Sequence, residues 1–254
     1  EAVLNRIVDT FEAEGSDAWW SKNPRIFLGD NYKIDDYEQV FDIVDVWFES
    51  GSTHTFVVDD REELNVSKSD LYLEGSDQHR GWFHSSLLEA CGTKGHAPFK
   101  NVLTHGFVLD EKGYKMSKSL GNVVDPWKAI AENGADAVRW YLVASGQPWL
   151  PKRFDPAGLV EVRRKHFGTL VNSYKFFADY ARIDRFDATS PEIPPVARRP
   201  EIDRWLASRT ESLVADVRSR MDAYDLAEAC RAIEDFVADD LSNWYIRRNR
   251  RRFW

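Results

Sequence analysis

The chain has 254 residues, of which 43% are hydrophobic and 30% charged, as in an ordinary globular domain. No run approaches the roughly 20 apolar residues of a membrane-spanning helix, and the charged start at Glu1 lacks the basic and then apolar pattern of a secretory signal, so we expect a cytoplasmic protein without membrane contact. The net charge of −8 divides into −11 over residues 1–150 and +3 over residues 151–254, which excludes a general nucleic-acid coat.

Only two cysteines occur, Cys91 and Cys230, and they lie far apart in the sequence. Two cysteines are too few for a disulfide framework or for a cysteine-based zinc site. We therefore expect both to be small buried residues in a reducing compartment, and we expect no protein-bound zinc.

The first elements are read from hydrophobic periodicity. Residues 1–22 carry apolar side chains at helical spacing and predict a helix. The β-branched run Ile43–Phe48 predicts a strand with Trp47 near its end. A second strand is expected at Asp70–Glu74, followed by a helix over Gln78–Ala90.

The next segment continues this alternation. Asn101–Asp110 predicts a strand, and the Asp110–Gly113 turn leads into a second short arm. Asp125-Pro126 begins a helix, because Asp caps a helix and Pro fits its first turn, and a further helix is expected over Ala135–Ala144. Strands that alternate with helices predict an α/β layer with parallel strands.

The pattern changes near residue 150 and becomes entirely helical. Three long amphipathic helices are expected, at Leu159–Tyr180, Ile202–Tyr224 and Leu226–Arg248, with a proline-rich connector over 191–200. The sequence therefore predicts an α/β domain over residues 1–150 and a helical-bundle domain over residues 151–254.

The sharpest local motif is Lys115-Met116-Ser117-Lys118-Ser119, between the expected hairpin and the capped helix. Two lysines among small hydroxyl residues can close over a polyphosphate and neutralise the charge on a leaving pyrophosphate. Lysine suits this role as a compact charge on a flexible stem. The alternative is an ordinary solvated surface loop.

A second cluster lies where the expected strand ends at Glu74 and a helix begins near Gln78. Ligands of parallel α/β sheets bind beyond the carboxyl ends of the strands, where Glu74, Asp77 and Gln78 would project. Carboxylates there can accept hydrogen bonds from ribose hydroxyls or an ammonium group, and Gly75 permits close backbone approach. The alternative is that Asp77 only caps the helix and Glu74 faces solvent.

Aromatic and histidine side chains add weaker signals. Trp47 and Trp82 could each supply a flat apolar wall to the same crevice, or could simply be core residues. The histidine spacings match no metal-ligand pattern, so we expect no metal site. His105-Gly106 is kept as a candidate because glycine there permits backbone contact with a flat base.

Five arginines occupy six positions in the run from Arg247 to Arg252. They could contact nucleic-acid phosphates. Alternatively, they complement the dipole of a helix C-terminus and pair with acids.

These motifs together resemble class I aminoacyl-tRNA synthetases. Lys115–Ser119 is similar to the complete Lys-Met-Ser-Lys-Ser signature of that class. Asp45–Gly51 and Tyr72–Phe83, in the same order upstream, resemble the isoleucyl branch more than the valyl or leucyl branches. The helical stretch that ends in Asn243–Arg247 resembles its anticodon-binding domain.

The resemblance implies the second half of a Rossmann-like nucleotide-binding fold, followed by part of an anticodon-binding helical bundle. It implies that isoleucine is activated with ATP and Mg²⁺ to isoleucyl-adenylate and transferred to tRNA(Ile). Lys115 and Lys118 would be catalytic, and Trp47 and Trp82 would line the isoleucine pocket. The implied ATP and adenylate contacts are Glu74, Gly75, Asp77, Gln78, His105, Gly106, Met116, Ser117 and Lys118.

The chain also departs from the family pattern. The His-x-Gly-His signature, the editing insertion and a cysteine-rich zinc module are absent from the sequence. We therefore expect an excised portion that is incomplete as an enzyme, with residues 1–22 at the return from the editing insertion. Two alternatives remain open, namely a tRNA-binding fragment without catalysis and a related class I synthetase such as the valyl enzyme.

Overall fold

The computed structural model describes all residues from 1 to 254. The chain divides into two compact units, the first made of Glu1–Ser67 and Gly81–Pro98 and the second of Lys68–Arg80 and Phe99–Trp254. None of the helices is both long and apolar enough to cross a membrane.

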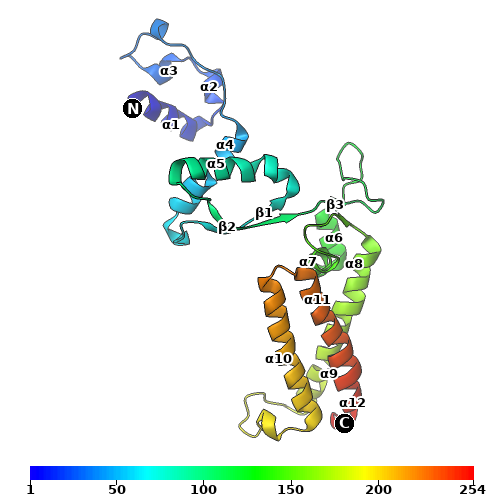
Figure 1. Cartoon of the computed structure of the whole chain (residues 1–254). Coiled ribbons are helices and arrows are strands. Elements are labelled where there is room, and N and C mark those ends of the chain that lie inside the picture. Colours follow the sequence, from blue (N-terminus) through cyan, green and yellow to red (C-terminus); the bar gives the residue numbers. More distant parts are fainter. The chain divides into compact units, whose positions relative to one another are not determined.

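The first unit is helical. The predicted helix over residues 1–22 is confirmed in two pieces, because Gly15 adopts a positive φ of 85° that ends the first helix. Helices α4 (Val46–Gly51) and α5 (Trp82–Lys94) pack against each other (Figure 1). Lys94, at the end of α5, donates to the carbonyl of His54 at 3.0 Å. The helices are α1 (Ala2–Glu14), α2 (Ala18–Ser21), α3 (Arg25–Leu28), α4 (Val46–Gly51) and α5 (Trp82–Lys94).

The strand predicted at Ile43–Phe48 is wrong. Val46–Gly51 is instead the helix α4, and Trp47 therefore lies on a helix. The Asp45 carboxylate accepts a hydrogen bond from the Trp47 backbone N–H at 2.8 Å, which caps this helix. Ile43 is 77% exposed and has no neighbouring strand, so the β-branched run has no sheet to pack on.

The second unit contains two small parallel sheets. Strand β1 (Ser69–Gly75) pairs with β2 (Phe99–His105), and β3 (Val108–Leu109) pairs with β4 (Lys152–Arg153). The prediction of parallel strands is thus confirmed, but the strand expected over Asn101–Asp110 is broken at Gly106. A Cβ atom on Gly106 would lie 2.4 Å from the carbonyl carbon of Leu150, so this crossing of two backbones requires glycine.

Helices make up the rest of the second unit. The helix expected from Gln78 begins later, at Trp82 in the first unit, because residues 76–80 form a 3₁₀ turn. The predicted helix over Leu159–Tyr180 runs from α8 through a π-helical segment into α9. The helices are α6 (Pro126–Asn133), α7 (Ala135–Ala144), α8 (Pro156–Val162), α9 (Gly168–Ile183), α10 (Glu201–Asp222), α11 (Leu226–Asp235) and α12 (Arg247–Asn249).

The main core of the second unit lies among α6, α7 and α8. Tyr141 donates its hydroxyl to the carbonyl of Arg153 at 3.0 Å and accepts from the N–H of Asp155 at 2.9 Å. The buried cluster is Ala129, Ala137, Val138, Tyr141, Phe154 and Leu159.

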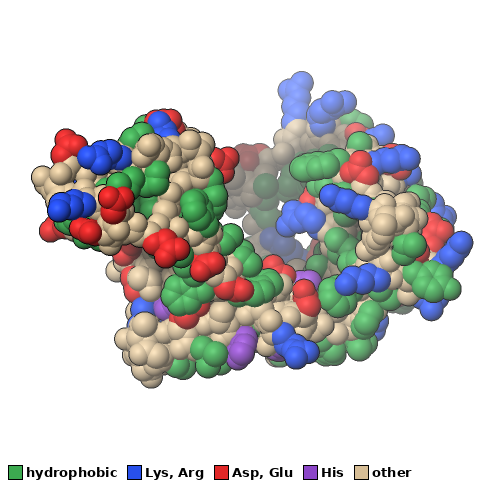
Figure 2. Space-filling model, turned by 90° about the horizontal axis from the view of Figure 1, so that it is seen from above, with side chains coloured by type: hydrophobic (Ala, Val, Ile, Leu, Met, Phe, Trp, Pro, Cys, Tyr) green, Lys and Arg blue, Asp and Glu red, His purple; other side chains and the backbone are tan.

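Hydrophobic side chains also lie at the surface among charged ones, as Figure 2 shows. The cysteines divide between the two environments. The expectation of burial is confirmed for Cys230 and wrong for Cys91, which lies exposed on α5.

Candidate functional site

The carboxyl ends of β1 and β2 bring the second predicted cluster, which begins at Glu74, next to the separately predicted His105. Gly75 lies directly opposite His105 in the parallel register, and Glu74 lies opposite Thr104. His105 Nε2 is 4.0 Å from Glu74 Oε2, a pair that attracts when the imidazole is protonated. Both side chains are about half exposed, so their polar atoms face solvent where a ligand can reach them.

The turn after β1 has a close backbone approach. A Cβ atom on Gly75 would lie 2.6 Å from Asp77 Oδ1, so glycine leaves room for the Asp77 carboxylate to fold back over the strand end. Gln78 Nε2 donates to Asp77 Oδ2 at 3.4 Å, and Glu74 accepts from the Gly75 N–H at 3.2 Å. The cap role considered for Asp77 is not seen, because α5 begins after Gly81.

The lysine loop, defined as Lys115–Ser119, is held in shape by Asp110 and Asn122. Asn122 Nδ2 donates to Asp110 Oδ2 at 2.9 Å and to the carbonyl of Lys115 at 3.2 Å, and its Oδ1 accepts from the Ser117 N–H at 2.9 Å. Asp110 also accepts from the N–H groups of Lys112 and Tyr114. The hydrogen bond from Asn122, followed by that from Tyr114, holds the pKa of Asp110 below its ordinary value.

The side chains of the lysine loop have different surroundings. Lys115 places its ammonium 5.1 Å from the centre of the Phe107 ring, which ties the loop to the chain just after β2. Met116 packs against the buried cluster of α6–α8, whereas Lys118 is exposed. The loop therefore has a clamped backbone and a cationic outer face, which suits reversible contact with a polyphosphate.

The two tryptophans belong to the first unit. Trp82, at the start of α5, donates its indole N–H to the carbonyl of Ser50 on α4 at 2.9 Å. Trp47 lies on α4 and is 42% exposed. Trp82 thus fixes α4 against α5, and Trp47 is left with apolar surface that is open to a ligand.

Some arginines of the terminal run, Arg247–Arg252, make contacts within the fold. Arg252 forms a two-point contact with Asp203, with its Nη2 donating to Oδ2 at 2.8 Å, and this contact lowers the pKa of Asp203. Arg248 stacks over the Trp244 ring with its guanidinium carbon 4.3 Å from the ring centre. Arg252 therefore pairs with an acidic side chain, as in the second interpretation given above. The guanidinium of Arg248 instead lies over an aromatic ring.

Comparison with known proteins decides the family. The model of the class I tRNA synthetases for isoleucine, leucine, methionine and valine matches residues 1–148, and that of the anticodon-binding domain of tRNA ligases matches residues 203–254. The chain belongs to the class I tRNA synthetase family. The fold class expected from the sequence is thereby confirmed.

Curated relatives of this synthetase chain are isoleucine–tRNA ligases. That of Thermus thermophilus is 48% identical over 84% of the chain, and those of Ruegeria pomeroyi and Porphyromonas gingivalis are 44% and 41% identical over 96% and 93% of the chain. The chain spans 21%, 25% and 23% of the length of these three relatives, respectively.

Solved synthetase structures share the fold at lower identity. Mycobacterium tuberculosis methionyl-tRNA synthetase, crystallised with methionyl-adenylate, has a TM-score of 0.61 and 23% identity over 78% of this chain and 37% of its own. The Agrobacterium radiobacter K84 LeuRS–tRNA–LeuAMS ternary complex has a TM-score of 0.56 and 24% identity over 70% of this chain and 23% of its own.

Asp110 and Asn122 shape the lysine loop of this synthetase chain, but neither was among the site residues predicted from the sequence. Asp110 could have been found, because Asp at the start of a turn often accepts from the backbone N–H groups that follow. Asn122 lies three residues after the lysine loop, and its contacts span up to twelve residues of sequence, so the folded hairpin is needed to bring them together.

Proposed function

We propose that the chain is a portion of an isoleucine–tRNA ligase, which activates isoleucine with ATP to isoleucyl-adenylate and transfers the isoleucyl group to tRNA(Ile). In this proposal residues 1–150 contribute the second half of the catalytic domain and residues 151–254 part of the anticodon-binding domain. The observation that carries it is the clamped lysine loop, which continues from the same β2 strand end that carries His105. The proposal includes a cytoplasmic location.

The residue roles follow from chemistry and position. Lys118, with Lys115, would bind the ATP phosphates and stabilise charge on the departing pyrophosphate, with Met116 and Ser117 shaping the loop. Mg²⁺ would arrive on the phosphates of the nucleotide, which is its usual mode in phosphate sites. The protein then acts by positioning and by charge stabilisation, without a covalent intermediate.

The strand-end groups would hold the adenylate. Glu74 and Asp77 offer carboxylate oxygens that accept from ribose hydroxyls or from the amino acid ammonium. Gln78 would bind the same ligand, while Gly75 and Gly106, with His105, would leave room for a flat base. Trp47 and Trp82 would line the side-chain pocket.

The test uses a full-length Thermus thermophilus isoleucine–tRNA ligase in which this chain replaces the matching segment. Isoleucine-dependent ATP–pyrophosphate exchange is expected, and Lys118→Ala should lower kcat by about 100-fold, the usual loss for one donor to developing charge. Lys112→Ala is the matched control, because Lys112 is an exposed lysine in the same hairpin. Equal loss in both variants contradicts the assigned role.

The amino acid is tested in the same chimaera. An apolar pocket distinguishes one methylene by about 10–200-fold, a limit for which the isoleucyl enzymes are themselves the standard example. Isoleucine should therefore give the higher kcat/KM. Faster exchange with valine would assign the chain to the valyl branch instead.

A second function, tRNA binding without catalysis, is favoured by the Arg248–Trp244 stack. A filter-binding titration of the isolated chain with tRNA(Ile) tests it, and the affinity should fall steeply with salt because phosphate contacts release counterions. Arg248→Ala should weaken binding more than Arg139→Ala, an exposed arginine on α7 that pairs locally with Asp136. No binding at low salt rules this function out for the isolated chain.

A further inference from the structure

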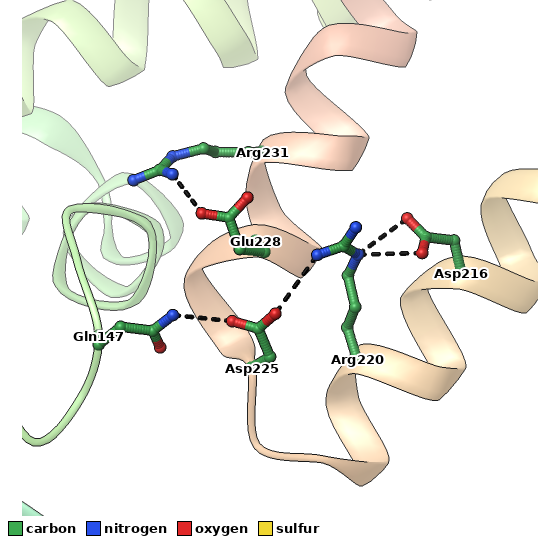
Figure 3. Close-up of polar contacts among 6 residues, drawn as sticks. All are labelled: Gln147, Asp216, Arg220, Asp225, Glu228 and Arg231. Atoms are coloured by element: carbon green, nitrogen blue, oxygen red, sulfur yellow. Dashed lines mark hydrogen bonds and ion pairs between the residues drawn. The ribbon is translucent and has the colours of Figure 1, made fainter.

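The segment Gly146-Gln147-Pro148, which we call the junction, follows α7 and meets the turn between α10 and α11. Gln147 Nε2 donates to Asp225 Oδ1 at 2.8 Å (Figure 3). A carboxylate can only accept, so this pairing fixes which end of the Gln147 amide faces Asp225. The junction is therefore joined to the helical bundle by an oriented hydrogen bond to a charged acceptor, the stronger kind.

Asp225 is itself held from α10. Arg220 places Nη1 3.3 Å from Asp225 Oδ2, and its Nε donates to Asp216 at 2.9 Å (Figure 3). Tyr224, just before Asp225, has a φ of 58°, a left-handed conformation that disfavours residues with side chains. The surroundings thus hold the turn in one conformation, which presents Asp225 to the junction.

The other side of the junction touches the strand that leads to the lysine loop. The carbonyl of Pro148 accepts from the Gly106 N–H at 2.9 Å, and the carbonyl of Gly146 accepts from Lys152 Nζ at 2.7 Å. The backbone N–H of Lys152 donates to the carbonyl of Phe107 at 2.9 Å. Since Lys115 lies over the Phe107 ring, these contacts run without a break from Asp225 to the lysine loop.

We propose that Gln147 is a positioning residue that couples the α10–α11 turn to the lysine loop. Its hydrogen bond to Asp225 fixes the junction, and the junction fixes Gly106 and Phe107, on which Lys115 rests. Anything that shifts the α10–α11 turn then changes the placement of the loop. The catalytic consequence rests on the proposed function, whereas the mechanical coupling does not.

The coupling is tested first in the isolated chain by hydrogen exchange. Gln147→Ala should speed exchange of the Gly106 and Lys152 amides by about tenfold, because a hydrogen bond to a charged acceptor is lost and the junction opens locally. Arg231→Ala is the matched control, since the Arg231–Glu228 pair in Figure 3 stays within α11. No change at Gly106, or the same change in both variants, overturns the coupling.

The consequence for catalysis is tested in the full-length chimaera by exchanging the two partners. Gln147→Glu sets two carboxylates against each other and should lower kcat for ATP–pyrophosphate exchange about tenfold, with the KM for isoleucine unchanged. Adding Asp225→Asn restores an amide–carboxylate hydrogen bond in the reverse direction and should recover most of the loss.

These outcomes separate the inference from the proposed function. The positioning role is overturned if Gln147→Glu changes kcat and the KM for isoleucine together. It is also overturned if kcat does not recover in the double variant with Asp225→Asn. If the chimaera without substitutions shows no ATP–pyrophosphate exchange, the proposed function fails. Hydrogen exchange in the isolated chain then still decides whether Gln147 couples the α10–α11 turn to the lysine loop.

Discussion

The segment around α6–α8 and the segment over residues 37–48 are both rich in apolar and aromatic residues, yet only the first has a core. Leu159 is 1% exposed and Ala137 is 4% exposed, whereas Ile43 is 77% exposed and Phe48 is 56% exposed. The difference is one of neighbours, because the α6–α8 segment folds back on itself within about 40 residues. The lysine loop is anchored to this self-contained core through Met116.

The comparison bears on how each region holds its functional residues. Packing against the core fixes the positions of the residues near it. The lysine loop is held in addition by the hydrogen bond between Asn122 and Asp110. Trp47 is held mainly through the capped helix that carries it and the Trp82–Ser50 hydrogen bond. We therefore expect substitutions near the core to have large effects on stability and those over residues 37–48 to have small ones.

The largest expected effect is at the centre of the core. Leu159→Ala should lower the free energy of unfolding of the second unit by about 2–5 kcal/mol, because the lost transfer energy adds to the cost of the cavity. Ile43→Ala should change stability by less than about 0.5 kcal/mol, since the side chain is already in water. Urea unfolding followed by circular dichroism measures both, and similar midpoint shifts would show that the two regions do not differ as described.

The same contrast explains which elements could be predicted from the sequence. Helices α6 and α7 were predictable because their signals are local, with Asp125 and Pro126 at the start and Gly134 between them. The strand at Ile43–Phe48 was wrong because β-propensity needs a neighbouring strand, and the local Asp45 cap prevailed. The α6–α7 helices and the segment Ile43–Phe48 thus differ in their long-range packing, not in their composition.

The candidate site shows the same limit. The motif at Lys115–Ser119 and the strand end at Glu74 could be located, because each combines turn chemistry with charged side chains at fixed spacing. The contact between Gln147 and Asp225 spans 78 residues and leaves no local trace in the sequence. Roles that depend on such contacts become visible only in the folded chain.

A matched pair of helix caps sharpens the comparison at a smaller scale. Asp125 accepts from the Trp127 N–H at 2.9 Å and Asp45 accepts from the Trp47 N–H at 2.8 Å, so the two caps are chemically alike. Asp125→Ala should cost about 1 kcal/mol in unfolding free energy, because α6 is part of the core. Asp45→Ala should instead speed exchange of the α4 amides with a smaller global effect, and equal urea midpoints for the two variants would contradict this.

The smallest expected effect concerns α10, which has no buried side chain and is fixed partly by the Arg252–Asp203 pair. The hydrogen bond from Arg252 is the main cause that lowers the pKa of Asp203, so the carboxylate stabilises the fold above its unfolded pKa of about 4. That stability is lost as the pH falls through the lower folded pKa. The gap in urea midpoint between the unsubstituted chain and Asp203→Asn should therefore be widest near pH 7 and should narrow below about pH 4. A gap for Asp203→Asn that stays constant with pH would mean that packing, not charge, holds α10 at this point.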